Sequence, residues 1–158
     1  MIVPDVDAQT GGLAAFDRGF GVALVDAVNA RTALPGLVPT VPINGSRYID
    51  GSVRSSENLD LAPDHAQVPV LAPLGGRGQR APAAGQFEAL RRPPEGGMDL
   101  ESQTEALGRQ GSHVVVITRD ADSRPAMGTN QTDLATRIPA ARAGFAQGRR
   151  EATRGGGP

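Results

Sequence analysis

The 158-residue sequence contains no cysteine, no tryptophan and no lysine, so its 16 basic residues are all arginine. Without cysteine, disulfide bonds and thiolate metal sites are excluded. Aromatic residues make up only 3% of the chain, so we expect a core built mostly of Ala, Val and Leu. The formal net charge of −1 gives no overall attraction to nucleic acid or to an anionic membrane, and we expect no nucleic-acid partner.

Long apolar runs are also missing. No stretch approaches the roughly 20 apolar residues that a membrane-spanning helix needs, so we expect no transmembrane segment. Hydrophobic residues nevertheless make up 39% of the chain, and 21 glycines add further non-polar positions. This share is typical of a chain that forms one ordinary globular domain.

Hydrophobic periodicity and turn residues predict an alternation of helices and strands. Helices are predicted at 22–34, 98–111 and 132–152, the last one interrupted or entered at Pro139. Strands are predicted at 11–17, on both sides of the hairpin turn Asn44-Gly45, at 68–74 and at 113–120. The order of elements in the second half predicts an α/β fold with a mostly parallel sheet and flanking helices. The last two strands are apolar runs typical of strands buried on both faces.

One short segment, RYIDGSVRSSENLDLA at residues 47–62, places an Asp-Gly pair at the end of a predicted strand. Taken alone, Asp50 and Gly51 are most simply a turn, because both residue types are common in turns. A carboxylate fixed at a strand end is also suited to act as a general base toward a hydroxyl nucleophile. Gly51 would then let the backbone turn sharply or let another group approach closely.

The sequence around this pair resembles the block around the catalytic aspartate of bacterial patatin-like phospholipases. The matching residues stand in the same order, and they are Ala33-Leu34-Pro35-Gly36, Tyr48, Asp50-Gly51, Asn58 and Leu61-Ala62. The resemblance extends from about Gly11 to Gly148. It implies a lipid acyl hydrolase with a Ser-Asp dyad, in which Asp50 is the general base and Gly51 the motif glycine. It also implies lipid ester or phospholipid substrates, no metal, no organic cofactor, and a cytoplasmic location with peripheral contact to membranes.

The sequence departs from that family at several positions. Ser52 stands where Gly or Ala is usual. Arg31 and Thr32 stand where small residues are usual, so the Arg31 side chain is expected either to crowd the helix packing or to point to solvent. The family's serine lies in a G-x-S-x-G motif ahead of the aspartate, and this sequence contains no such motif.

Only 49 residues precede Asp50, too few for the missing strands, glycine-rich loop and nucleophile helix. We therefore expect residues 1–148 to be the C-terminal half of a patatin-like layered α/β domain, incomplete and inactive by itself. The expected partner is an upstream fragment that carries the nucleophile. Residues 149–158 are predicted to be a frayed, basic and glycine-rich tail.

Two other functions stay open. The chain is alternatively a non-catalytic remnant or interaction module that keeps this fold without the chemistry. A small nucleotide-binding α/β domain is a further alternative, because residues 76–81 fit G-x-G-x-x-A. Pro82 argues against the helix that a dinucleotide site requires directly after this motif. His65 and His113 are far apart in the sequence and have no acidic residues at the spacing typical of a metal site, so both are predicted to be structural or exposed.

Overall fold

The computed structural model describes residues 1–74, 97–128, 130 and 133–155. These residues form two compact units. The first unit contains Met1–Val68 and residues 97–115, and the second contains residues 69–74 and the described residues from Val116 onward. The G-x-G-x-x-A candidate at 76–81 lies outside the described residues.

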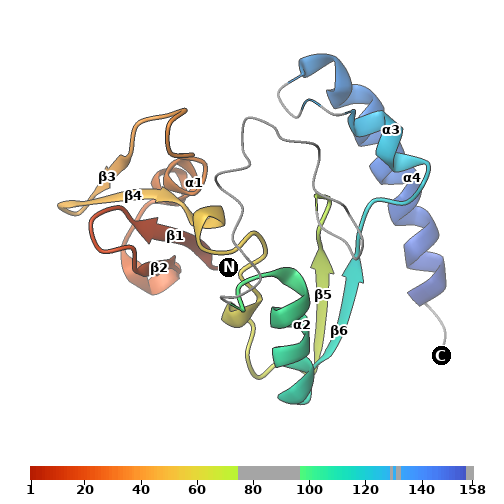
Figure 1. Cartoon of the computed structure of the whole chain (residues 1–158), viewed down its shortest axis with the longest axis horizontal. Coiled ribbons are helices and arrows are strands. Elements are labelled where there is room, and N and C mark those ends of the chain that lie inside the picture. The colour runs from red at the N-terminus through yellow and green to blue at the C-terminus, as the bar shows by residue number, and fades with distance from the viewer. Residues whose placement is uncertain (75–96, 129, 131–132, 156–158) are drawn as a thin grey trace. The chain divides into compact units, whose positions relative to one another are not determined.

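A four-stranded antiparallel sheet forms the centre of the first unit (Figure 1). Its strands, in the spatial order β2-β1-β4-β3, are β1 (Val3–Asp7), β2 (Leu13–Phe16), β3 (Val41–Ile43) and β4 (Ser46–Asp50). Because every pairing in this sheet is antiparallel, the prediction of a mostly parallel sheet is wrong. The links from β1 to β2 and from β3 to β4 are too short for the crossover that parallel neighbours need.

The hairpin between β3 and β4 is confirmed. Asn44 and Gly45 have φ angles of 48° and 85°, and two positive φ angles in succession are what a type I′ turn requires. Pro42 lies in β3, which is an edge strand where a missing N–H is tolerated. The turn pairs Tyr48 with Val41, and the strand then ends at Asp50.

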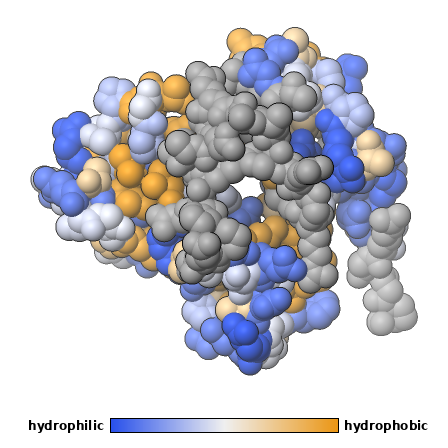
Figure 2. Space-filling model, in the orientation of Figure 1, coloured by the Kyte–Doolittle hydropathy of each residue, from blue (hydrophilic) through white to orange (hydrophobic). Residues whose placement is uncertain are grey.

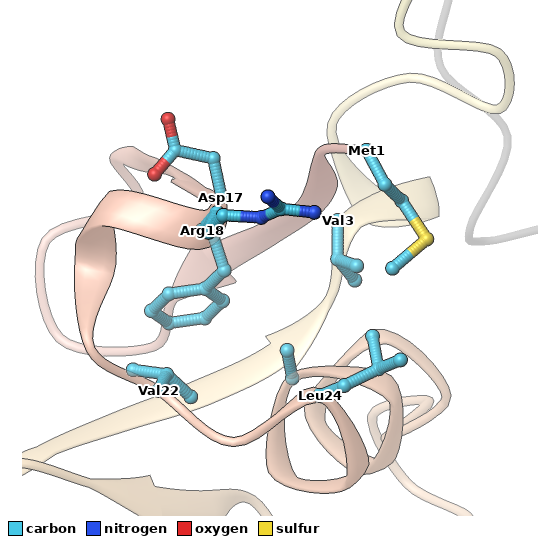
Figure 3. Close-up of a pocket in the computed structure, with 8 residues that line it drawn as sticks. Met1, Val3, Asp17, Arg18, Val22 and Leu24 are labelled. Atoms are coloured by element: carbon cyan, nitrogen blue, oxygen red, sulfur yellow. The ribbon is translucent and has the colours of Figure 1, made fainter.

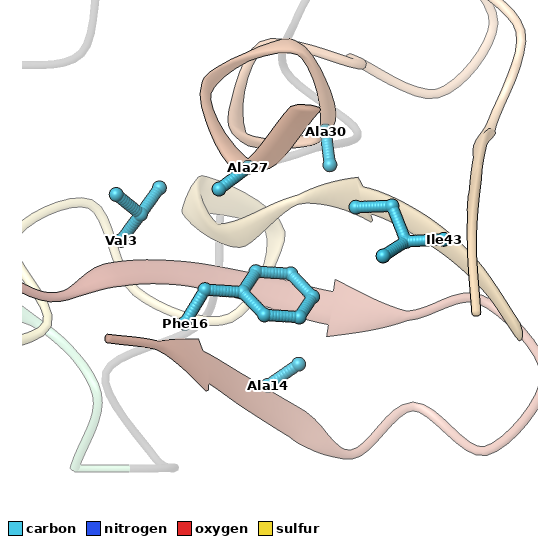
Figure 4. Packing of buried hydrophobic residues seen from close by; sticks show 6 residues of the cluster. All are labelled: Val3, Ala14, Phe16, Ala27, Ala30 and Ile43. Carbon is cyan, nitrogen blue, oxygen red and sulfur yellow. The ribbon is translucent and has the colours of Figure 1, made fainter. Parts of the chain in front are cut away.

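Helix α1 (Leu24–Arg31) covers one face of this sheet (Figure 4). Its buried residues Ala27 and Ala30 are three positions apart and therefore lie on the same side of the helix. They pack against four buried residues from the strands, namely Val3, Ala14, Phe16 and Ile43. The core of the first unit is thus built mainly from small aliphatic side chains, as the composition predicts.

Strands β5 (Gln67–Leu71) and β6 (His113–Ile117) form a separate two-stranded sheet. The N–H of His113 donates to the Ala66 carbonyl, and the N–H of Ala72 donates to the Ile117 carbonyl. These bonds join the two starts and the two ends, so the strands run in the same direction. The parallel arrangement that the order of elements predicts for the second half of the chain is confirmed for these two strands.

The prediction that these two strands are buried on both faces is wrong. In β5, Val68 and Val70 are buried, whereas Leu71 is 75% exposed. In β6, Val115 is 45% exposed. Side chains along a strand alternate between its two faces, so this pattern in β5 shows one covered face and one open face.

Helices α2 and α4 confirm the helices predicted at 98–111 and 132–152 in type, whereas α3 was not predicted. Helix α2 (Leu100–Arg109) starts at Asp99, whose carboxylate accepts hydrogen bonds from two N–H groups of the first turn. A short helix, α3 (Ser123–Met127), precedes α4 (Arg137–Gly155). Pro139 lies in the first turn of α4, where its missing N–H costs no helix hydrogen bond. The helix continues past residue 148 to Gly155, where the sequence suggested a frayed tail.

Apolar side chains also reach the surface. Figure 2 shows hydrophobic areas among the hydrophilic ones. On α1, Leu24, Val25 and Val28 are between 45% and 64% exposed. The sheet-facing side of this helix is therefore built from alanines, and its larger apolar residues point outward.

Gly51 is buried where β1 passes directly beside the end of β4. It opens a 3-10 helix, η2 (Gly51–Val53). A Cβ at this position would lie 2.0 Å from the carbonyl oxygen of Pro4 and 2.7 Å from its carbonyl carbon. Because these atoms belong to the backbone of a central strand, no side-chain rotation can relieve the overlap. The close approach that the sequence suggested for this glycine is present.

We predict that Gly51→Ala lowers the free energy of unfolding by about 2 kcal/mol or more, because the added methyl group forces β1 and β4 apart. Gly108→Ala is the matched control. A Cβ at Gly108, in α2, meets no atom within 4 Å, so alanine there should raise the free energy of unfolding by about 0.5–1 kcal/mol. Urea denaturation followed by circular dichroism measures both. Equal effects of the two substitutions would contradict the close approach.

Candidate functional site

The structure places Asp50 at the C-terminal end of β4, held through both its backbone and its side chain. Its N–H donates to the Ala33 carbonyl at 3.0 Å. Its carboxylate oxygen Oδ1 accepts a hydrogen bond from the N–H of Ser52 at 2.7 Å and thereby caps η2. The side chain is 14% exposed. Asp50 therefore starts a turn, as the simplest interpretation requires, and it also has a fixed orientation.

Arg31, the last residue of α1, forms an ion pair with Asp50. Its Nη1 donates to Oδ1 of Asp50, the same oxygen that accepts from Ser52. The Arg31 side chain is 28% exposed. The sequence suggested that this arginine either crowds the helix packing or points to solvent. Neither is the case, because its guanidinium pairs with the carboxylate of Asp50.

A third charged residue, Asp5, lies beside this pair. It is directly opposite Asp50 in the pairing of β1 with β4, and residues directly opposite each other in such a pair have side chains on the same face. Asp5 is 0% exposed. Neither of its carboxylate oxygens has a hydrogen-bond partner among the residues that the structure describes.

Burial raises the pKa of Asp5 from 3.8 to about 7; the guanidinium of Arg31 opposes this rise, and the carboxylate of Asp50 adds to it. A carboxylate loses hydration when it is buried, and this disfavours its charged form. Asp5 is therefore partly protonated near neutral pH. Asp5 was not among the predicted site residues, because the polar side chains in Val3–Asp7 hide the strand pattern and a single aspartate in a sequence does not indicate burial.

Asn58, another residue of the family-like block, makes structural contacts. Asn58 is buried and has a positive φ of 50°, its N–H donates to Ser55 Oγ at 3.0 Å, and its side-chain amide donates to the Ser55 carbonyl. Gln103 of α2 accepts hydrogen bonds from Ser55 Oγ at 3.0 Å and from the Leu59 N–H at 3.1 Å. These bonds hold the loop after η2 against α2.

A pocket of about 230 Å³ opens in the first unit (Figure 3). Its lining residues are Met1, Val3, Phe16, Asp17, Arg18, Val22, Leu24 and Ala27. Val3, Val22 and Leu24 turn apolar side chains toward it, whereas the carboxylate of Asp17 points away. Asp50 is not part of this lining, so the pocket and the candidate base are separate features.

The histidines and the basic tail do not form a second site in the described part of the chain. His65 and His113 are exposed, and the Nδ1 of His65 lies 2.7 Å from the Pro63 carbonyl oxygen. No three residues of the kinds that bind metals lie close enough together among the described residues to hold an ion. Arg150, predicted in a solvated tail, forms an ion pair with Asp120. Within the described ranges, no helix has the length and apolar character needed to cross a bilayer.

We predict that the free energy of unfolding falls by about 4 kcal/mol as the pH rises from about 4 to above 7, because Asp5 must lose its proton in the folded state. Unfolded Asp5 ionises near pH 3.8, whereas folded Asp5 keeps its proton until about pH 7. The folded state thus binds the extra proton, and the stability that this proton supplies is lost with rising pH. Urea denaturation between about pH 5 and pH 8 measures most of this loss.

Asp5→Asn should remove most of this fall, because asparagine stays neutral throughout the range. A smaller fall should remain, since burial also raises the pKa of Glu57. Asp26→Asn removes a charge from an exposed position of α1 and should keep the wild-type fall. A wild-type protein whose stability does not change between these pH values would show that Asp5 is not buried as described.

The sequence was compared with models of known protein families and with curated proteins. No family model matches the chain, and no curated protein matches it.

Proposed function

We propose that the chain is the aspartate-bearing part of a patatin-like lipid acyl hydrolase, and that Asp50 is its general base. In the proposed reaction a serine outside these 158 residues attacks the ester carbonyl of a lipid while Asp50 takes the proton of the serine hydroxyl. Asp50 returns this proton to the departing alcohol, and water then attacks the acyl-enzyme and releases the fatty acid from the serine. Asp50 and Gly51 are the site residues that the chain supplies, and the reaction needs no metal or organic cofactor.

The fixed orientation of the Asp50 carboxylate is the observation that carries this proposal. Its described hydrogen bonds, from Ser52 and Arg31, are both to Oδ1. In the proposal, Oδ2 is the oxygen that receives the proton. A base held by its neighbours acts without first losing rotational freedom, which favours proton transfer.

The contacts around Asp50 involve the residues on which the family resemblance rests. Ala33, from the Ala-Leu-Pro-Gly segment, accepts the hydrogen bond of the Asp50 N–H, and Gly51 allows the close passage of β1 at Pro4. This agreement supports a patatin-like assignment of the block. We propose with it a cytoplasmic protein that meets membranes peripherally, at its lipid ester or phospholipid substrate.

The ion pair with Arg31 favours a second candidate function, a non-catalytic remnant or interaction module of the same fold. A guanidinium on the carboxylate stabilises the charge that a base must give up when it takes a proton. A remnant that no longer needs the base can keep this ion pair as a structural contact. The two candidates differ in whether Asp50 supports turnover once a nucleophile is supplied.

We predict that the purified chain alone does not hydrolyse p-nitrophenyl esters above background, because it has no G-x-S-x-G serine to form an acyl-enzyme. Co-expression with the amino-terminal half of a patatin-like hydrolase, carrying the glycine-rich loop and the serine motif, should restore turnover. Asp50→Ala should then lower the restored rate by about a hundredfold or more, the usual contribution of a positioned general base.

Asp26→Ala is the matched control, since it removes an exposed carboxylate from α1, and it should leave the restored rate unchanged. Co-purification of the two halves without turnover would favour the interaction module. Turnover by the chain alone that survives Asp50→Ala would overturn the proposed function.

A further inference from the structure

Two carboxylates and one guanidinium meet on the face of the sheet that α1 covers. Asp5 and Asp50 are directly opposite each other on β1 and β4, and like charges in such positions repel. The ion pair joins Arg31 to Asp50, while Asp5 has no hydrogen-bond partner among the described residues. A buried polar group without a partner is costly. The protonation of Asp5 therefore depends on the charges of Arg31 and Asp50.

The elements around Asp5 supply few other charges. On the same face of the β1–β4 pair, the next titratable groups are Asp7 and Tyr48, which are opposite each other. The carboxylate of Asp7 accepts hydrogen bonds from the N–H groups of Gln9 and Thr10 and so belongs to the following turn. Strands β2 and β3 and the 3-10 helix η2 contain no ionisable side chain.

Arg31 has the chemistry to serve both carboxylates. A guanidinium has five N–H donors arranged in a planar fork. The described contact with Asp50 uses Nη1 alone, which leaves donors for a second acceptor. The charge of Arg31 also acts on Asp5 in the direction expected of a nearby cation, because it favours the ionised form of that carboxyl.

We infer that Asp5 is a positioning residue of the Asp50 site, because the two carboxylates share Arg31. The guanidinium pairs with Asp50 while Asp5 carries a proton. It is drawn toward Asp5 when that proton passes to solvent. With Asp5 neutral, one cation balances one anion. With Asp5 ionised, two anions compete for one cation, and the hold of Arg31 on Asp50 weakens. The coupling of Asp5, Asp50 and Arg31 exists in this chain without any partner or reaction. Only its effect on catalysis rests on the proposed function.

The test is a pH titration of the chain labelled with ¹³C at its aspartate carboxyl carbons and with ¹⁵N at arginine. One carboxyl should titrate near pH 7, and Asp5→Asn should remove that signal. The Nε resonance of Arg31 should shift with the same midpoint in the wild-type protein and should not shift in Asp5→Asn. A purely structural Asp5 would leave the Arg31 signal unchanged.

Two further variants should move the Asp5 midpoint in opposite directions, each by roughly one pH unit, which is the scale of a charge within about 4–6 Å. Asp50→Asn should lower the midpoint because it removes a repelling anion. Arg31→Met should raise it because it removes an attracting cation. Arg47→Met is the control, since Arg47 lies on β4 with its side chain on the opposite face, and it should leave the midpoint unchanged.

A midpoint that stays the same in both variants, or an Arg31 resonance that does not follow Asp5 in the wild type, would overturn the inference. The wild-type measurement decides the question even if a variant fails to fold. Because the titration involves no turnover, it separates the two claims. Lost coupling leaves the proposed function standing, and absent hydrolysis leaves the coupling intact.

Discussion

The contact between β1 and the end of β4 determines the geometry of the candidate site. The carbonyl of Pro4 lies so close to the Cα of Gly51 that this position has room for a hydrogen atom but not for a Cβ. The same pairing puts Asp5 opposite Asp50, and α1 lies across both strands with Arg31 at its end. If β1 shifted by one residue, Asp5 would turn to the other face of the sheet, and the arrangement of two carboxylates and one guanidinium would be lost.

This arrangement places charged groups in a core of small side chains. Such a core buries little apolar surface to offset the free-energy cost of burying charge. The buried residues that pack between α1 and the sheet are three alanines, one valine, one isoleucine and one phenylalanine. A buried carboxyl without a partner weakens such a core when it ionises. Groups that reduce stability and whose pKa is strongly displaced occur often at functional sites, although structural ion pairs displace pKa values as well. The cost of burying Asp5 therefore agrees with a functional coupling between Asp5 and Asp50.

Features that depend only on residues adjacent in the sequence were predictable from it. The Asn44-Gly45 turn, the start of α2 near Asp99 and the entry of α4 at Pro139 all follow from local backbone preferences. The position of Asp50 at a strand end followed from the same turn. The direction of the main sheet was not predictable in this way, because β1 was not recognised and its pairing with β4 joins segments far apart in the chain.

The ion pair of Arg31 and the burial of Asp5 were also beyond prediction. Whether Arg31 points to solvent, into the packing or onto Asp50 depends on how α1 is rotated above the sheet. The sequence places Asp5 in a short polar segment, and only the strand register brings it under the helix. Both features arise from tertiary packing, which hydrophobic periodicity does not encode.

The central claim is that Asp5 lies directly opposite Asp50, and the absence of native cysteine allows a direct test by cross-linking. Residues directly opposite in an antiparallel pair have Cα atoms about 4.5–5.5 Å apart, within disulfide reach. The double variant Asp5→Cys with Asp50→Cys should therefore lose both free thiols on mild oxidation of the folded protein. Asp5→Cys with Tyr48→Cys pairs diagonal positions about 7–8 Å apart and should keep its thiols. Cross-linking of the diagonal pair in preference to the direct pair would contradict the register and, with it, the site.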